Sequence, residues 1–431
     1  MVRTMALVTV IACFLMSTPC LAADTGALAE ENAQLRQRVE NLERQVQDLQ
    51  TVVGPTSTAE TPGTPAEPDE GKKPFWSTLD VQFYGYIKAD ASWDSSRVNT
   101  GNFVTYVEAD GEDDDEFNLT ARQTRLGLKI NGPNLGNIET KGLIEGDFYG
   151  AGGTENKNIF RMRHGYLQLL WPEDDFSILA GQTWDVVSPL YPETLNFTIL
   201  WAAGNIGYRH PQVRVTKQIQ LQDDVQMELA GAISRTISDI EEAGPNRPGE
   251  DAGFPTVQGR VALTFPWFGI EPTTAGLSGH YGEEEYDLGG DVESWSINVD
   301  ILQPVNEWLV LKAEAFMGEN LDDYYGGIGQ GVRNADATAD GPIGSKGGWV
   351  AAGMKPCESW RFNAGIGIDD VDSDDLGDSG RTLNRSIFGN AIYAINEHTD
   401  VGVELSQWRT DYKNASDEDD VRIQGSFIYK F

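Results

Sequence analysis

The chain is poor in cysteine and in basic residues, and each shortage excludes a class of protein. Only three cysteines occur among 431 residues, which excludes a disulfide framework and any metal site built on several cysteines. Lysine and arginine number 32 against 67 acidic residues, which gives a net charge of −35. Because phosphate binding needs a basic surface, the chain is not expected to bind nucleic acid.

Long apolar runs are also scarce. The longest, residues 5–16, falls short of the ~20 residues that a membrane-spanning helix needs. Arg3 precedes this run and small residues follow it up to Ala22 and Ala23. The pattern predicts a secretory signal peptide over residues 1–23, with a retained membrane anchor as the alternative. If the mature chain crosses a membrane, it must then do so as a closed β-barrel.

A heptad repeat over residues 24–53 predicts a short coiled coil. Leucines recur every seven residues and valines follow at the second seam position, and Arg38 and Glu43 flank the seam. The seam and flanking residues are Leu28, Leu35, Arg38, Val39, Leu42, Glu43, Val46 and Leu49. Valine and leucine at these positions favour two strands, whereas the segment from Arg38 to Glu43 resembles a known trimerisation motif. Both oligomers, and a lone amphipathic helix, therefore stay open. Residues 54–75 hold five prolines and predict an extended, semi-rigid spacer.

Residues 76–431 predict an all-β membrane barrel of sixteen antiparallel strands. The last strand alternates apolar Val421, Ile423 and Phe427 with polar residues, and the chain ends on Phe431. In a membrane barrel the apolar face meets lipid and the polar face meets the lumen. Seven compact turns, rich in Pro, Asn and Gly, alternate with eight mostly long, Gly-rich or acidic connections. Seven turns and eight loops join sixteen strands, and short periplasmic turns with long outer loops are typical of such barrels.

The third long connection, residues 185–207, is unusually apolar for an exposed loop. It and the residue before it supply four large aromatic side chains, Trp184, Tyr191, Phe197 and Trp201. We therefore expect this loop to fold into the barrel and narrow it. The alternatives are a lid over the barrel and a contact between subunits.

Strand alternation places several cations on the inner face of the barrel. These are Arg125, Lys129, Arg161, Arg163, Arg214 and Arg260. Rings of Arg and Lys select anions in pores, so the set predicts a constriction that attracts anions. The alternative is that these cations pair with Glu145, Asp147 or acids of the loops.

Three motifs resemble the trimeric DcaP-like outer-membrane porins. They are the segments 181–184 (GQTW), 209–214 (RHPQVR) and 318–328, which runs from Gly318-Glu319 to Gly327-Ile328. The order of coiled coil, spacer and barrel is also similar. The resemblance implies a homotrimer in the outer membrane of a Gram-negative bacterium, with the coil in the periplasm. It also implies passive uptake of small, often negatively charged solutes, and it adds Arg209 to the pore-lining cations.

No pattern of catalytic or metal-binding residues accompanies these features. The four histidines are scattered, and the acidic runs 110–116, 369–378 and 417–420 are expected to be solvated outer loops, with a divalent-ion site as the alternative. The favoured function is a water-filled diffusion channel for small hydrophilic solutes, organic anions such as carboxylates among them. A structural tether between membrane and cell wall is the second candidate and a lipid hydrolase the third. No cofactor and no catalytic residue is predicted.

Overall fold

The computed structural model describes residues 79–109, 114–235, 248–286, 290–334 and 339–431. Residues 74–431 form one compact unit. The expected signal peptide (1–23), coiled coil (24–53) and spacer (54–75) lie outside the described residues.

A single antiparallel sheet closes on itself through pairing of its first and last strands. Its members are β1 (Asp80–Asp94), β2 (Glu116–Thr120), β3 (Arg125–Asn131), β4 (Glu139–Asp147), β5 (Arg161–Trp171), β6 (Phe176–Trp184), β7 (Arg209–Gln222), β8 (Val225–Ser234), β9 (Thr256–Phe265), β10 (Thr273–Tyr286), β11 (Gly290–Asn306), β12 (Leu309–Glu319), β13 (Gly344–Cys357), β14 (Trp360–Val371), β15 (Arg381–Ala394), β16 (Thr399–Tyr412) and β17 (Glu418–Lys430). Both β2 and β3 pair with β1, one beyond the other. They are therefore two halves of one interrupted strand, and the prediction of a sixteen-stranded barrel is confirmed.

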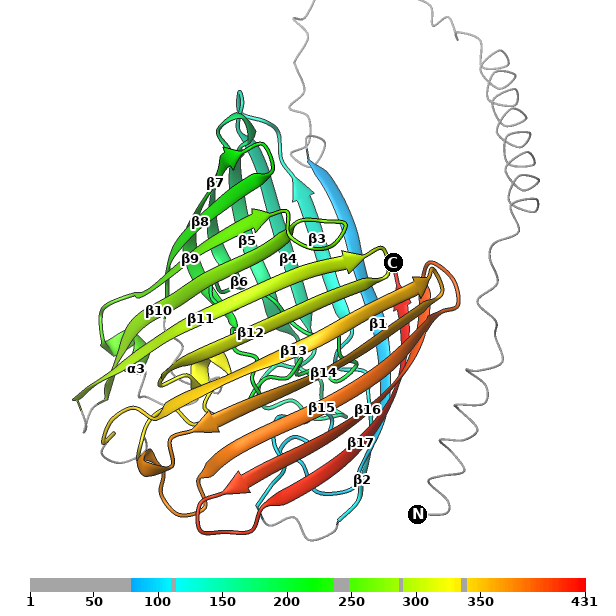
Figure 1. Cartoon of the computed structure of the whole chain (residues 1–431), viewed down its shortest axis with the longest axis vertical. Helices are drawn as coiled ribbons and strands as arrows, with labels where there is room; N and C mark the ends of the chain where they lie inside the picture. Colours follow the sequence, from blue (N-terminus) through cyan, green and yellow to red (C-terminus); the bar gives the residue numbers. More distant parts are fainter. Residues whose placement is uncertain (1–78, 110–113, 236–247, 287–289, 335–338) are drawn as a thin grey trace, which may run out of the picture. The chain divides into compact units, whose positions relative to one another are not determined.

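Short turns and long loops lie at opposite ends of the barrel. The start of β1 and the C-terminus lie at the same end, which is also the end of the short turns (Figure 1). The remaining helical pieces are short: η2 (Pro172–Asp174), α3 (Pro248–Asp251), η3 (Asp322–Tyr324) and η4 (Ser373–Asp375). Within the described ranges, no helix is long and apolar enough to cross a membrane.

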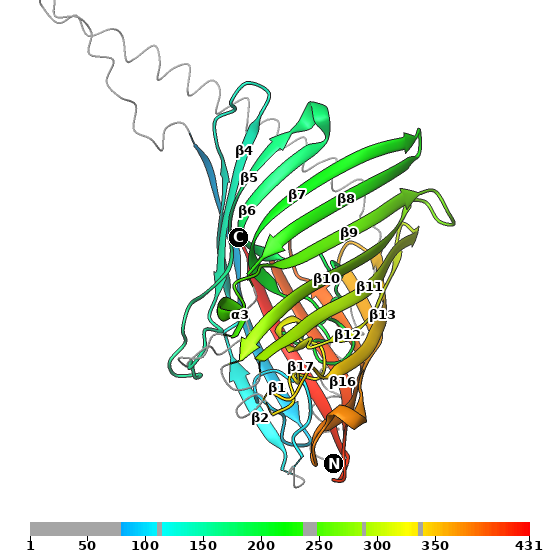
Figure 2. The same ribbon diagram turned by 90° about the vertical axis from the view of Figure 1, so that its left-hand side faces the viewer.

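The two faces of the wall differ in chemistry as the alternation predicts. On β1, Phe83 and Ile87 are exposed on the outer face, whereas Lys88, Asp90 and Asp94 are buried on the inner face. On β17, Phe427 is exposed and Arg422 is buried. An apolar exterior around a polar interior is the arrangement of a membrane barrel. Figure 2 shows the tilted strands of this wall from the side.

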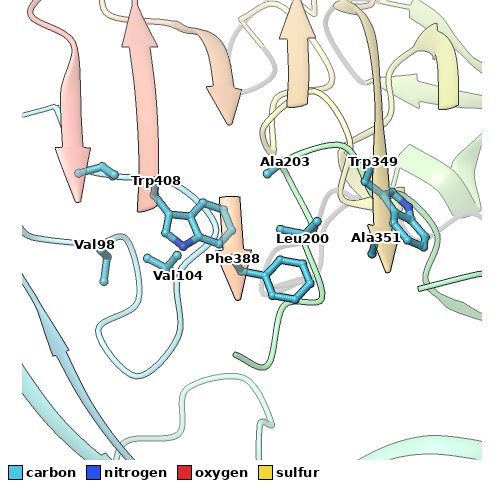
Figure 3. Close-up of a cluster of buried hydrophobic side chains, with 9 residues drawn as sticks. Val98, Val104, Leu200, Ala203, Trp349, Ala351, Phe388 and Trp408 are labelled. Carbon is cyan, nitrogen blue, oxygen red and sulfur yellow. The ribbon is translucent and has the colours of Figure 1, made fainter. Parts of the chain in front are cut away.

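Three connections enter the barrel, not one. The third loop (185–208) packs its Leu200 and Ala203 against wall residues Phe388 and Trp408 and against Val98 and Val104 of the first loop (95–115) (Figure 3). The sixth loop (320–343) adds buried Leu321, Tyr324 and Ile328. The expectation of plain outer loops at these places is wrong, because their apolar side chains bury against the third loop.

Two acidic residues that were expected to be solvated are instead buried and hold these loops. Asp369 and Asp420, expected in solvated runs, are fully buried. Asp420 accepts hydrogen bonds from the backbone N–H groups of Ser95 and Ser96 in the first loop, at 2.8 and 3.2 Å. Asp369 accepts one from Ile328 of the sixth loop at 3.3 Å. These carboxylates satisfy loop backbone groups that would otherwise be buried without partners.

Candidate functional site

The tip of the third loop, at Leu195 and Asn196, is bound to the barrel wall. The contact lies opposite the root of the loop, where it leaves β6 and enters β7. The carboxylate of Glu404 on β16 accepts hydrogen bonds from the backbone N–H groups of Leu195 at 2.6 Å and Asn196 at 3.0 Å. The carbonyl of Leu195 in turn accepts from Lys88 Nζ at 2.7 Å and Gln424 Nε2 at 2.9 Å. Strands β1, β16 and β17 therefore hold one short segment of a loop that starts at β6.

A second set of contacts holds the flanks of the loop. Glu314 on β12 accepts hydrogen bonds from the N–H of Leu190 at 2.7 Å and from Trp349 Nε1 at 3.1 Å. Asn384 on β15 donates to the carbonyl of Ala202 at 2.7 Å. Gly204 passes so close to the wall that a Cβ atom there would lie 2.1 Å from the carbonyl oxygen of Gly348. The loop thus lies directly on the inner wall.

The root of the loop is closed by Asp185. Its backbone N–H donates to the carbonyl of Tyr208 at 2.9 Å, and its carboxylate accepts from the N–H of Tyr208 at 2.8 Å. The carboxylate also contacts His210 Nδ1 at 2.8 Å and accepts from Gln258 Nε2 at 3.0 Å. Burial alone would raise the pKa of the Asp185 carboxyl, but His210 and these hydrogen bonds hold that pKa below its ordinary value. The two ends of the loop are therefore joined through one ionised side chain.

The four aromatic residues expected in the loop differ in accessibility. Phe197 and Trp201 are buried, whereas Tyr191 is 48% exposed and stacks on Trp184 with ring centroids 6.4 Å apart. Trp201 stacks on Tyr325 of the sixth loop at 4.1 Å and an interplanar angle of 8°. Trp184 and Tyr191 are thus available to a solute, while Phe197 and Trp201 support the loop from within.

Three of the predicted cations share two carboxylates on β4. Arg161 forms a two-pronged pair with Asp147, at 3.0 and 3.1 Å. Arg163 pairs with Glu145 at 3.0 Å and Asp147 at 3.1 Å, and Arg125 lies 3.4 Å from Glu145. The alternative that the sequence left open, pairing with Glu145 and Asp147, therefore describes these three residues.

The other predicted cations lie in different surroundings. Arg260 pairs with Asp300 at 2.7 Å and Glu228 at 2.9 Å. Lys129 and Arg214 form no ion pair with any described residue. The ammonium of Lys129 lies 4.8 Å from the ring centroid of Tyr84. Arg214 donates to Gln212 Oε1 at 3.0 Å and to the carbonyl of Trp184.

Arg209 is placed unlike the others. Alternation along β7 would send it to the outer face with Val213, but its side chain is buried among rings of the third loop and only 1% is exposed. Arg163 is almost as buried. Neither side chain is accessible to a solute in this structure, so we expect both to act on a solute through their charge and not by direct contact.

The inner wall carries four cations outside the predicted set. Lys88, Lys312, Arg361 and Lys430 face inwards and pair with Asp90, Glu193 and Asp400. The same alternation signal could have found Lys88 and Lys430, which stand on the polar faces of the first and last strands. Asp90 lies on the same strand as Lys88, whereas Asp400 lies on another strand and Glu193 in the third loop, and pairing with these two is not visible in sequence.

The third loop borders a cavity on each of its sides. One, of about 310 Å³, lies at the short-turn end and includes Pro192, Glu193, Lys312 and Arg361 in its lining. The other, of about 190 Å³, lies among the first, third and sixth loops and includes Tyr106, Ala202 and Tyr325. Open space therefore lies on both sides of this loop. In the described ranges, no group of three or more His, Cys, Asp or Glu side chains could hold a metal ion.

Several solved structures share this fold. The crystal structure of the outer membrane channel DcaP of Acinetobacter baumannii is 23% identical, with a TM-score of 0.67 over 82% of this chain and 98% of that chain. An anion-selective porin from Comamonas acidovorans is 13% identical, with a TM-score of 0.53 over 82% and 100% of the two chains. OmpF of Salmonella typhi, in complex with daunomycin, is 13% identical, with a TM-score of 0.54 over 83% and 99%. A comparison with curated proteins gives no significant match.

The sequence itself matches a family. The model of the DcaP outer membrane protein family aligns with residues 14–251, which is more than half of the 431 residues. The fold of its structural neighbours agrees with that match. The chain therefore belongs to the DcaP outer membrane protein family of outer-membrane channels.

Proposed function

We propose that this protein is a diffusion porin for small hydrophilic solutes and that it prefers organic anions such as carboxylates. The observation that carries the preference is an imbalance of charge beside the third loop. Arg125, Arg161 and Arg163 surround two carboxylates, those of Glu145 and Asp147. These five groups hold a formal excess of one positive charge.

The excess positive charge acts at the place where its attraction for a solute is least screened by water and salt. In the narrow space beside the loop, the effective dielectric is lower than in water, so fixed charges act more strongly there. The acidic outer loops face solvent, where charges are screened beyond ~8 Å at physiological salt. Arg161, Arg125, Lys129, Arg214 and Arg260 are the cations that a passing carboxylate would meet. The Comamonas acidovorans neighbour is described as anion-selective, which agrees with this preference.

We also propose how the protein assembles and where it is located. The protein forms a homotrimer in the outer membrane of a Gram-negative bacterium, with the coil of residues 24–53 in the periplasm. OmpT of Vibrio cholerae, a structural neighbour, is described in a trimer form. The apolar outer face of the barrel contacts outer-membrane lipid. Diffusion through a channel involves no covalent chemistry, so no side chain needs to act as an activated nucleophile.

A planar-bilayer experiment tests the channel against the alternative of a structural tether. The purified full chain should produce discrete, ohmic current steps. Arg161→Gln should lower the permeability to acetate relative to sodium. Lys217→Gln, which removes a charge from the outer face of β7, should not. A protein that sediments with purified cell wall but produces no current steps would favour the tether instead.

A further inference from the structure

The side chain of Asn320, at the start of the sixth loop, is buried without a hydrogen-bond partner. It is 1% exposed, and neither its Oδ1 nor its Nδ2 forms a hydrogen bond with any described residue. Its backbone is fixed, because its N–H donates to the carbonyl of Ile343 at 3.0 Å and its carbonyl accepts from Ser294 Oγ at 2.8 Å. A buried amide without partners is costly, so this side chain requires a partner that the described residues do not supply.

Two carboxylates flank this amide. Glu284 of β10 is 2% exposed, and its carboxylate lies near the nitrogen of the Asn320 amide and near enough to Asp322 to be repelled by it. On the other side, Asp322 Oδ1 and Asn320 Oδ1 lie 2.0 and 2.3 Å from the point where a Cβ atom of residue 331 would stand. Residue 331 is a glycine. The two oxygens are therefore close neighbours, and no side chain of residue 331 separates them.

The amide of Asn320 cannot satisfy both carboxylates. An ionised carboxylate only accepts hydrogen bonds, and an amide side chain donates from its nitrogen alone. With the nitrogen towards Glu284, the amide oxygen meets the carboxylate of Asp322. A half-turn of the amide exchanges its two ends and places the oxygen towards Glu284 instead. In either orientation an amide oxygen lies beside a carboxylate oxygen, and a cation between these oxygens would remove the conflict.

The chemistry of these ligands selects the kind of cation. Carboxylate and amide oxygens are the ligands that Ca²⁺ prefers, at distances of about 2.3–2.6 Å. Two carboxylates balance the charge of one divalent ion. Ca²⁺ takes about six to eight oxygen ligands in a flexible geometry, so water has to complete its shell. Asp322 also lines the cavity of about 190 Å³ among the first, third and sixth loops, which gives water and the ion access.

We propose that Glu284, Asn320 and Asp322 bind one Ca²⁺ ion between β10 and the sixth loop. The two carboxylates neutralise the ion, the amide oxygen of Asn320 is the third protein ligand, and water from the cavity fills the remaining positions. The site uses two acids and an amide, so it differs from the clusters of three or more acidic, His or Cys side chains that the described ranges lack.

The bound ion fastens the sixth loop to two neighbours. Tyr324 stacks on His280 of β10 with ring centroids 4.1 Å apart, and Tyr325 stacks on Trp201 of the third loop at 4.1 Å. Both tyrosines directly follow the calcium ligands of the loop in the chain. Loss of the ion should therefore loosen both contacts. The site acts on the stability of the loops and exists whether or not the barrel conducts.

A calcium titration of the full chain in detergent tests the site. At constant ionic strength, the melting temperature should rise saturably when EDTA is replaced by calcium, because a ligand that binds only the folded state stabilises it. Half-saturation is expected at about 0.1–1 mM, as in extracellular calcium modules. A melting temperature that is equal in EDTA and in about 10 mM calcium, above that range, overturns the proposal. That result would favour a protonated Glu284, which could donate to the amide oxygen in place of the ion.

Matched variants separate this site from the acidic outer loops. Asp322→Asn keeps the shape of the side chain but removes a ligand charge, and it should raise the half-saturating calcium concentration about tenfold or more, because ligand charge sets calcium affinity. Asn320→Ala should also raise it. Asp374→Asn, which changes an exposed acid of η4, is the control and should leave it unchanged. A calcium dependence that is the same in Asp322→Asn as in the wild type would show binding to solvated acids and overturns the proposal.

A crystal of the wild-type chain keeps the test independent of the variants' folding. After a soak in calcium chloride, an anomalous peak should lie about 2.3–2.6 Å from the amide oxygen of Asn320 and from the carboxylate of Asp322. A water molecule at that place without an anomalous signal overturns the proposal.

Discussion

The backbone amide of Leu195 donates to the carboxylate of Glu404 across 2.6 Å, although 209 residues separate the two in sequence. Asn196 donates to the same carboxylate. This contact fastens the tip of the third loop to the wall opposite its root. The position of the loop, and so the width of the path, therefore depends in part on one inner side chain.

Glu404→Ala should release the tip of the third loop. Two buried N–H groups would lose their acceptor, at a cost of about 1–3 kcal/mol each. We expect a lower melting temperature and a noisier, larger single-channel current. Glu404→Gln, which retains one acceptor oxygen, should have a smaller effect. Glu397→Ala, in an exposed turn, is the matched control, and an equal effect of Glu397→Ala and Glu404→Ala would contradict the fastening role.

Gly204→Ala should disturb the seating of the loop at its other contact. Gly204 has a φ of +106°, and an added Cβ would meet the carbonyl oxygen of Gly348 at 2.1 Å. The strained backbone alone costs on the order of 1–3 kcal/mol. We expect lower thermal stability and faster proteolysis within the loop. Gly377→Ala meets no atom within 4 Å and should behave as wild type; a comparable loss there would refute the explanation.

Asp185 should keep the root of the loop closed across the neutral and mildly acidic range. Its pKa is lowered in the folded protein, so its contribution is present above the usual aspartate value of ~3.9 and is lost only as pH falls through the lower, folded-state pKa. Asp185→Asn should destabilise the protein at pH 7 by roughly 1.5–3 kcal/mol, the value of a charge-assisted hydrogen bond. Thermal melts at pH 7 test this. A variant as stable as wild type at pH 7 would show that the carboxylate is not the closing group.

The proposed coil should reinforce the trimer. Replacement of both Leu35 and Leu42 by serine removes two apolar side chains from the seam, each worth on the order of 1.5–3 kcal/mol when buried. The trimer should then dissociate at a lower temperature on semi-native gels. Asn41 and Gln47 lie off the seam, and their replacement by serine is the control. An unchanged dissociation temperature for the leucine variant would contradict this role of the coil. The barrel walls alone would then stabilise the trimer.

The wall of the barrel could be predicted from sequence because its signals are local. Alternation on β1 and β17, the turn residues and the terminal Phe431 all act over a few residues. The entry of the third loop was also predictable, because Phe197, Leu200 and Trp201 are too apolar for an exposed segment. The first and sixth loops gave no comparable signal. Their buried residues, Val104 and Leu321 among them, are few and scattered between acidic or glycine-rich stretches.

The pairing of charges could not be predicted in the same way. Glu145 and Asp147 share a face with Arg161 and Arg163, but a register shift between β4 and β5 decides which atoms meet. Arg209 is a further example. Strand parity would place it outside, and only the path of the loop around Tyr208 turns it into the barrel. Long-range register and loop packing, rather than local pattern, determine these contacts.

The reversal potential in a tenfold gradient of potassium chloride tests the charge imbalance most directly. The account predicts anion preference for the wild-type channel, because the three guanidiniums of Arg125, Arg161 and Arg163 surround only two carboxylates. Asp147→Asn should shift the potential further towards anions, and Arg161→Ala with Arg163→Ala should shift it towards cations. Cation preference in the unmodified protein, unchanged by these substitutions, would contradict the account. It would show that the acidic loops determine the ion selectivity.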